Sequence, residues 1–453
     1  MRNTIWRGLA FIVMMALLMT ACTAQELTPI PITATPPGLP TMTPPPAESA
    51  LTSLEVSNPT GPIQTSVMHY FNTDSDKRIL TKIFSDYGNA NLQNPAVDIT
   101  PGRGDFKAQV QLMMAGDNPP DLVSYQSGYL TQLVVNNNKL TDLTKFWSDN
   151  RLDNVITTSL KPTSIYNGKT YVIPQDVFVA GFYYNPKVFS RAGITTPPKT
   201  WNEFLFDCSR LRGTSVSPIA LGAKNRWPVQ YWFDYLLAYT AGMDYRQKLM
   251  DGKAAYSDQQ VINVIQTFIN LQANGYFVKT TNAFSWSDAA DQVAKGQAAM
   301  TLMDSRIVSY WNRSGLKAGV DYDFFPFPQI NSKLPLVAFG SVDGWVVPAN
   351  AKDQAGAEKF ILTMLSPTNQ ASFAKAQSAI AAVNSIPAGS YDSVMQKSAD
   401  YLAHAQFYNE YQLSTATAMA EGGLNMFAQI ISNPVNYMIY INQTAQVAKE
   451  VFK

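Results

Sequence analysis

Three aspartates at the ends or interruptions of apolar runs are the first candidates for chemistry. These are Asp176, Asp304 and Asp343. A pair of carboxylates is enough to hydrolyse a glycosidic bond when the two lie roughly 5 to 9.5 Å apart. A single carboxylate can instead accept hydrogen bonds from neighbouring hydroxyl groups of a bound molecule. The same three side chains are therefore candidates for catalysis and for binding.

Other polar and aromatic side chains follow predicted strands. Asp74 follows the first strand, and Tyr125 and Gln126 follow the third. Open α/β sheets bind ligands outside the carboxyl ends of their strands, so we expect these residues to face a cleft. For Asp74, helix capping is an equal alternative, because Asp commonly caps a helix such as the one predicted after it. Gln175 lies beside Asp176, and a polar pair inside an apolar run is costly unless something uses it.

An aromatic segment and an arginine add further candidates. Trp227 opens a predicted helix beside a proline, which favours a position at the edge of a cleft. Tyr231 follows in the same segment and is open to either a cleft or a core position. Arg306 comes two residues after Asp304, where its guanidinium can hold hydroxyl groups or pair with an acidic group of a ligand.

The segment "GSVDGWVVP" (340–348) supplies the last candidates. Ser341 and Trp345 flank Asp343 at a second place where polar residues interrupt an apolar run. Asp343 has a competing interpretation, because Asp-Gly is a common turn pair. We favour ligand contact slightly over the turn as the interpretation of Asp343.

Few side chains are available for nucleophilic or metal chemistry. The chain has two histidines, His69 and His404, and two cysteines, Cys22 and Cys208. This scarcity argues against a histidine-based triad and a His/Cys metal site. Cys208 lies in a helical pattern and is interpreted as a buried, inert thiol. No catalytic residue, cofactor or metal is predicted, although a calcium site built from carboxylates and carbonyls would be hard to recognise.

The first residues predict export and anchoring. An apolar run at 9–19 follows two arginines, which is the layout of a secretory signal over 1–21. "MTAC" (19–22) resembles the lipobox of bacterial lipoproteins, which implies a lipid on Cys22 and a place on the extracytoplasmic face of the membrane. The Pro- and Thr-rich stretch that follows, 22–62, is interpreted as a semi-rigid linker.

Composition limits the partners. The whole chain has 453 residues, enough for two cores. Removing the signal with its two arginines leaves 32 basic and 33 acidic residues, and this balance gives no sign of a nucleic-acid partner. Aromatic residues reach 12%, which suits surfaces that meet ligands with a flat apolar face and a polar edge.

Strands and helices are predicted to alternate along the folded part, which is typical of an α/β sheet. In "KTYVIPQDVFVAGFYYN" (169–185) two strand-like runs are expected, broken at 174–176. "PPKTWNEF" (197–204) predicts a helix start, with Thr200 as cap and Glu203 reaching back to it. The other predictions are strands at 65–71, 97–101, 119–125, 297–303 and 344–348, helices at 77–88, 105–116, 257–275 and 355–366, and a helical tail from about Tyr391.

Five segments in order carry a family resemblance. They are "YVIPQDVFVAGFYYNPKVF", "PPKTWNEF", "VAKGQAAMTLMDS", "DYDFFPFP" and "FGSVDGWVVPANAKDQAGAEKFILTML". Together they resemble the extracellular solute-binding proteins of ABC importers, in the sugar-binding, maltose-binding-protein-like branch. The resemblance runs from about Val67 to the C-terminus.

The resemblance implies an α/β, two-lobe periplasmic-binding-protein-like fold of type II, with the ligand cleft between the lobes. One lobe would be 63–175 with 344–390, and the other 176–343 with 391–453. It also implies a monomer that delivers a sugar to the membrane subunits of an ABC permease. Tyr125 matches a stacking position of the family.

Two departures from the family leave the ligand class open. The family often has Gly and Trp where this chain has Ser305 and Arg306, and Asp343 also departs from its usual pattern. An acidic or non-sugar solute is therefore one alternative to a neutral sugar. A lipid-anchored glycoside hydrolase that uses the three aspartates, and an adhesion or sensor lipoprotein, are the others.

Overall fold

The computed structural model describes residues 64–71, 73–101, 106–279 and 281–453. All of them belong to one unit, Pro59–Lys453. The predicted signal, Cys22 and the linker lie outside the described residues. Among the helices that the structure describes, none is long and apolar enough to cross a membrane.

One mixed sheet organises this unit, in the strand order β2-β1-β3-β10-β6-β8-β7. β1, β2 and β3 are parallel to one another, and β7 is parallel to β8. Between these two parallel groups lie the long antiparallel strands β10 and β6. The path strands are β1 (Thr65–Met68), β2 (Ala96–Asp98), β3 (Leu122–Gln126), β6 (Ile173–Tyr184), β7 (Ser217–Ala220), β8 (Ala298–Asp304) and β10 (Val337–Val346).

Shorter strands extend or accompany this sheet. β9 (Asp323–Phe325) and β11 (Ile380–Ala381) pair with β6, and β12 (Gln406–Asn409) pairs with β10. A separate hairpin is formed by β4 (Ile165–Tyr166) and β5 (Lys169–Thr170).

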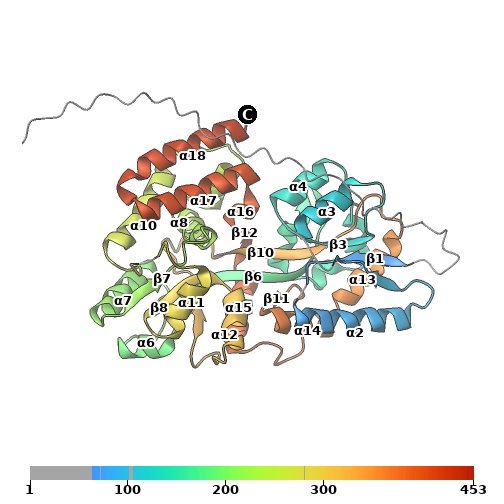
Figure 1. Cartoon of the computed structure of the whole chain (residues 1–453), viewed down its shortest axis with the longest axis horizontal. Helices are drawn as coiled ribbons and strands as arrows, with labels where there is room; N and C mark the ends of the chain where they lie inside the picture. Colours follow the sequence, from blue (N-terminus) through green and yellow to red (C-terminus); the bar gives the residue numbers. More distant parts are fainter. Residues whose placement is uncertain (1–63, 72, 102–105, 280) are drawn as a thin grey trace, which may run out of the picture. The chain divides into compact units, whose positions relative to one another are not determined.

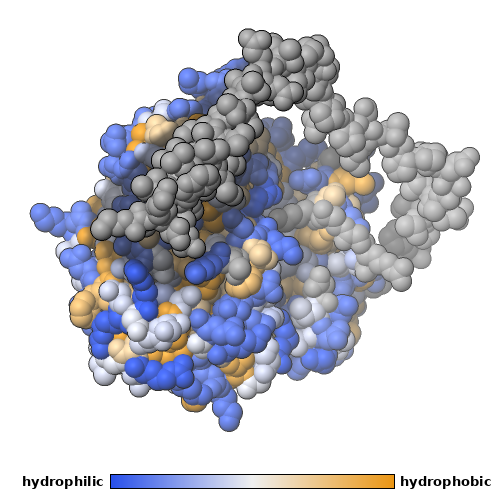
Figure 2. All heavy atoms as spheres, turned by 60° about the vertical axis from the view of Figure 1, so that its left-hand side comes forward, coloured by the Kyte–Doolittle hydropathy of each residue, from blue (hydrophilic) through white to orange (hydrophobic). Residues whose placement is uncertain are grey.

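Helices gather around each parallel group of strands (Figure 1). α2, α13 and α14 pack together beside β1, whereas α8, α10, α17 and α18 form a second group. The α-helices are α2 (Asp74–Ala90), α3 (Phe106–Ala115), α4 (Tyr129–Asn136), α5 (Thr144–Asp149), α6 (Pro186–Arg191), α7 (Trp201–Gly213), α8 (Gln230–Ala241), α9 (Met243–Met250), α10 (Gln259–Ala273), α11 (Trp286–Ala294), α12 (Arg306–Arg313), α13 (Gln354–Met364), α14 (Pro367–Gln377), α15 (Ser393–His404), α16 (Tyr411–Ser414), α17 (Thr417–Ser432) and α18 (Tyr437–Val451). Figure 2 shows hydrophilic and hydrophobic residues interspersed on the visible described surface.

Several local predictions are confirmed by the structure. Thr200 accepts a hydrogen bond from the Glu203 backbone, and Glu203 reaches back to the Thr200 backbone, so α7 begins with the predicted capping box. After α10, Gly275 takes a left-handed φ of 68°, a conformation that glycine adopts without strain. Cys208 is fully buried, as expected.

The predicted break at 174–176 is wrong, because β6 runs without interruption from Ile173 to Tyr184. Pro174 has no N–H to give to a sheet. The pairing with β10 shifts at this point through a bulge in β6: Asp343 lies opposite Asp176 and the next residue, Gly344, lies opposite Pro174, so Gln175 is the extra residue. The tail from Tyr391 is mostly helical, but it also contains β12, which the sequence analysis did not predict.

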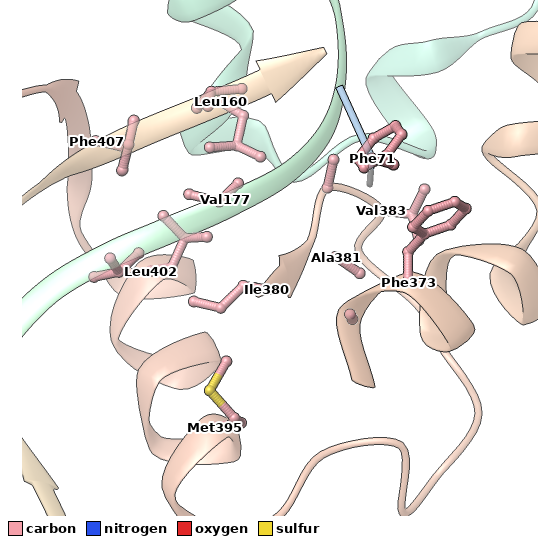
Figure 3. Close-up of a cluster of buried hydrophobic side chains, with 14 of the residues drawn as sticks. Phe71, Leu160, Val177, Phe373, Ile380, Ala381, Val383, Met395, Leu402 and Phe407 are labelled. Carbon is pink, nitrogen blue, oxygen red and sulfur yellow. The ribbon is translucent and has the colours of Figure 1, made fainter. Parts of the chain in front are cut away.

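Apolar side chains fill the region beside this long strand (Figure 3). Val177 of β6, Ile380 of β11, and Met395 and Leu402 of α15 belong to one buried cluster. Segments distant in sequence therefore meet at β6. Burial at this point stabilises the connection between the two groups of strands, because each buried aliphatic side chain contributes about 1.5–3 kcal/mol relative to exposure.

The contact between β6 and β10 gives the first prediction. A Cβ on Gly340 would lie 1.8 Å from the carbonyl oxygen of Phe178, which is backbone of the paired strand and has no room to yield. We expect Gly340→Ala to lower the free energy of unfolding by about 2–3 kcal/mol, in the upper range for overpacking. The measurement is urea unfolding followed by circular dichroism.

Gly213→Ala is the matched control. A Cβ on Gly213 meets no atom within 4 Å, and the residue ends α7. This control should be neutral or stabilising by up to about 1 kcal/mol, because alanine favours helix over glycine. Equal stability of the two variants would contradict the close approach at Gly340.

Candidate functional site

A large cleft of about 1360 Å³ opens at the ends of the strands. Its walls come from the segments after β1 and β3, from Phe178 of β6, from the start of α11, from the length of α12, from Asp343 of β10, and from the α16–α17 region. Both groups of strands thus contribute to it. This is the position that open α/β sheets use for ligands.

Five of the predicted residues line this cleft. They are Asp74, Tyr125, Gln126, Arg306 and Asp343. Asp74 is the first residue of α2, whereas the cap is Thr73 and its reciprocal partner is Asp76. The carboxylate of Asp74 is exposed and not engaged in the capping box, so the capping role falls to its neighbours.

Arg306 is held in place from three sides. One guanidinium nitrogen donates to Asp304 Oδ2 at 2.6 Å, and the other donates to Ser341 Oγ at 3.0 Å. The guanidinium carbon lies 3.8 Å from the ring centre of Phe178, which is stacking distance. The Arg306 side chain keeps 39% of its surface exposed, so it is fixed from behind and still open to the cleft.

Three further predicted residues support Arg306 rather than line the cleft. Asp304, Tyr231 and Ser341 are each at most 1% exposed. Asp304 also accepts a hydrogen bond from the Arg306 backbone at 3.0 Å, and the Tyr231 hydroxyl lies 2.9 Å from Asp304 Oδ2. These three predicted residues therefore lie one layer behind the surface of the cleft.

The structure places Gln175, Trp345 and Trp227 away from the lining. Gln175 accepts a hydrogen bond of 2.9 Å from the Trp345 indole, and both side chains are buried in the core. The polar side chain of Gln175 therefore accepts a hydrogen bond within the core and does not face the cleft. Trp227 is half-buried and packs edge-on against Tyr231, with 6.1 Å between ring centres.

Asp176 lies directly opposite Asp343 in the antiparallel register of β6 and β10. Only 1% of Asp176 is exposed, and neither of its carboxyl oxygens has a hydrogen-bond partner among the residues that the structure describes. Burial, together with the neighbouring Asp343, raises the pKa of Asp176 well above its usual value, although Arg306 opposes the shift. Like charges directly opposite each other are destabilising, so the charged form of Asp176 is disfavoured at this position.

The cleft also contains aromatic residues that were not predicted. Tyr70, Tyr129, Phe178 and Trp286 join Tyr125 among the lining residues. Tyr70 was assigned to a buried strand, but β1 ends at Met68, which releases it toward the cleft. No local pattern distinguishes such aromatics from core residues before the strand ends are known.

Residues of the C-terminal segment were also missed. Gln412 lines the cleft, and the buried Glu410 lies behind it. Both follow β12, the strand that was interpreted as helical tail. Recognising "QFYN" (406–409) as a strand would have indicated them, since ligand-facing residues follow strand ends.

No group of three or more His, Cys, Asp or Glu residues able to hold a metal ion occurs within the described ranges. The lining instead combines flat aromatic faces with carboxylate, amide, hydroxyl and guanidinium groups. This combination suits a molecule that has both apolar faces and many hydrogen-bonding groups.

The sequence matches the bacterial extracellular solute-binding proteins over residues 75–371. The chain belongs to this family, and its α/β fold is that of the periplasmic solute-binding proteins. Members of the family bind solutes and are not enzymes, so the hydrolase alternative is not retained.

Individual relatives and solved structures agree with this assignment. An uncharacterised ABC transporter extracellular-binding protein of Pyrococcus horikoshii is 27% identical over 349 residues, which cover 76% of each chain. A diacetylchitobiose binding protein of Streptomyces coelicolor is 24% identical over 330 residues, 66% of this chain and 64% of the relative. The solved structure of the solute receptor AcbH, described as preferring β-D-galactopyranose, superposes with a TM-score of 0.77 at 22% identity and covers 87% of this chain and 100% of its own. RafE in complex with raffinose gives a TM-score of 0.69 at 16% identity, with 86% and 100% covered.

The pairing of Arg306 with Asp304 gives the second prediction. Arg306→Met leaves the buried Asp304 carboxylate without its cation. We expect the free energy of unfolding to fall by about 2 kcal/mol, below the range for a fully buried pair because Arg306 is partly exposed to solvent. Chemical unfolding at pH 7 provides the measurement.

The control completes a double-mutant cycle. Asp304→Asn in the Arg306→Met background removes the unpaired charge and should recover at least half of the loss. The single variant Asp304→Asn completes the comparison. If the stability losses of Arg306→Met and Asp304→Asn simply add in the double variant, the ion pair does not hold Arg306 in place.

Proposed function

We propose that this chain is the solute-binding component of an ABC transporter, and that it captures a sugar of more than one unit in the cleft and delivers it to a membrane permease. The observation that carries the proposal is the lining itself. Aromatic rings such as Tyr125 and Trp286 offer faces to the C–H surfaces of a sugar, while Gln126, Arg306 and Asp343 offer groups for its hydroxyls.

The size of the cleft favours an oligosaccharide. Pockets for small molecules usually enclose roughly 300–1,000 Å³. The cleft here has about 1360 Å³, which leaves room for several sugar rings. The relatives named for diacetylchitobiose and the solved complex with raffinose are consistent with a ligand of this kind.

The charges of the site favour a neutral ligand over an acidic one. Arg306 is a cation of the lining, but Asp304 is already bonded to it, and Asp343 lies near enough to raise the pKa of Arg306 against the effect of burial. A third carboxylate, from a ligand, would compete with these two for one guanidinium. Hydroxyl groups can use the remaining N–H donors without adding a charge.

The attachment and movement of the protein complete the proposal. A lipid on Cys22 and the linker 22–62 would hold the folded unit at the extracytoplasmic face of the membrane. The lobes would be 63–175 with 344–390 and 176–343 with 391–453, closing around the ligand by a hinge motion. The permease would then recognise the closed form. A relative named as an ABC transporter extracellular-binding protein supports this role.

The third prediction tests sugar binding directly. We expect a fragment covering Pro59–Lys453 to melt at a higher temperature with one or a few related glycans from a panel that includes galactose, raffinose and diacetylchitobiose. A ligand at 100 times its dissociation constant adds about 2.7 kcal/mol to the native state. Chromatography should recover the glycan intact. A melt that moves only with acidic solutes such as uronates would reject the neutral sugar.

Tyr125→Ala provides the matched test of the site. Loss of one stacking ring should weaken binding of the active glycan by roughly tenfold, about 1.4 kcal/mol. Phe206→Ala removes an exposed ring of α7 outside the cleft and should leave the affinity unchanged. Calorimetric titration of both variants gives the comparison.

A further inference from the structure

A continuous chain of hydrogen bonds runs behind the cleft and reaches its surface at both ends. It begins at Arg306, passes through Asp304 to the Tyr231 hydroxyl, continues to Glu410 and ends at Gln412. The Tyr231 oxygen lies 2.7 Å from Glu410 Oε2, and Gln412 Nε2 donates to Glu410 Oε1 at 2.6 Å. Arg306 and Gln412 line the cleft, whereas the three residues between them are at most 3% exposed.

The number of protons in this chain is constrained by its geometry. The Tyr231 hydroxyl has one hydrogen but lies at hydrogen-bond distance from two carboxyl groups, those of Asp304 and Glu410. If both carboxyls were ionised, one contact would set two oxygens against each other without a proton between them, in a site closed to water. One of the two carboxyls must therefore carry a proton and donate it to the Tyr231 oxygen.

The contacts identify Glu410 as the protonated group. Asp304 has a guanidinium of Arg306 at 2.6 Å and a backbone N–H at 3.0 Å, both of which stabilise its charged form. The bonded partners of the Glu410 carboxyl in the described structure, Tyr231 and Gln412, are neutral. In agreement with this assignment, burial raises the pKa of Glu410 to about 7, and the charge of Asp304 contributes to the rise.

We infer that Glu410 is a positioning residue of the cleft, whose proton fixes Arg306 and Gln412 in the arrangement that binds solute and thereby makes solute affinity depend on pH. The inference rests on the proposed function, since it concerns the same cleft. When the proton leaves, Asp304 and Glu410 compete for the single hydroxyl hydrogen of Tyr231. The series of hydrogen bonds must then rearrange, and the side chains of Arg306 and Gln412 at its two ends lose their fixed positions.

Other charged groups surround Glu410 and must be separated from it. Burial raises the pKa of Asp234 on α8, which pairs with Arg246 of α9 at 2.8 Å beside the same segment. Asp343 of β10 and Asp176 of β6 face Arg306, and the pKa of Asp176 is raised by burial and by Asp343. Asp176 is thus the main alternative source of pH dependence, and Asp176→Asn is the control for it.

The fourth prediction follows from replacing Glu410 with a permanent donor. Glutamine has nearly the shape of the protonated side chain, and its amide can donate to Tyr231. The first readout needs no solute. In the full chain in detergent, the Nε resonance of Arg306, assigned by its absence in Arg306→Met, should shift with a midpoint near pH 7. The resonance should not titrate in Glu410→Gln, and it should still titrate in Asp176→Asn.

The second readout is affinity for galactose, raffinose and diacetylchitobiose. If only the protonated form binds, a group with a pKa of about 7 raises the apparent Kd of the bound sugar about tenfold between pH 6 and pH 8. Glu410→Gln should keep the value of the native protein at pH 6 across this range. Tyr231→Phe, which removes the shared hydroxyl, should also lose the pH dependence and serves if Glu410→Gln does not fold.

The outcomes separate the two proposals. A titrating Arg306 resonance that Glu410→Gln abolishes, without binding of any of the three sugars, supports the proton assignment and counts against the sugar. An Arg306 resonance that titrates equally in Glu410→Gln overturns the inference, whatever the sugars do. Loss of the pH dependence in Asp176→Asn but not in Glu410→Gln overturns it as well, because the proton would then belong to Asp176.

Discussion

The antiparallel pairing of β6 with β10 is the interaction on which the site depends. These two strands lie between the parallel groups of the sheet, so they connect the helices on either side. Their register sets Ser341 opposite Phe178 and Asp343 opposite Asp176. Because residues two apart on a strand share a face, these four side chains lie on the same side of the ribbon. The ribbon thus provides Arg306 with both its stacking ring and one of its hydrogen-bond acceptors.

The charges around this ribbon follow from the same arrangement. Asp176, Asp304, Asp343 and Glu410 all act on Arg306 or on its partners. One guanidinium cannot offset four carboxylates that are each at most 5% exposed, because burying an uncompensated charge is costly. Protons must therefore replace charge at some of these groups. Asp176 and Glu410, which have no cation at bonding distance in the described structure, are the two whose pKa values are raised.

The sequence predicted the fold better than it predicted the surface of the site. The capping box of α7 and the apolar stripe of α10 are local patterns, and both helices form where they were expected. The candidate residues were found because polar side chains at strand ends are visible in a sequence. Whether such a side chain faces the cleft or supports another depends on long-range contacts. Tyr231 and Asp304 come from different elements, and nothing local indicates that they meet.

The same contacts show why the three aspartates do not form the carboxyl pair of a glycosidase. A glycosidase needs two carboxyl groups that both reach the scissile bond, one protonated and one ionised. Of the three aspartates first considered, only Asp343 lines the cleft. Asp304 is fixed to Arg306 and closed to solvent, and Asp176 is buried between the strands. Asp304 thus holds the Arg306 guanidinium, and Asp343 alone of the three reaches the cleft surface, which is one carboxyl group fewer than hydrolysis requires.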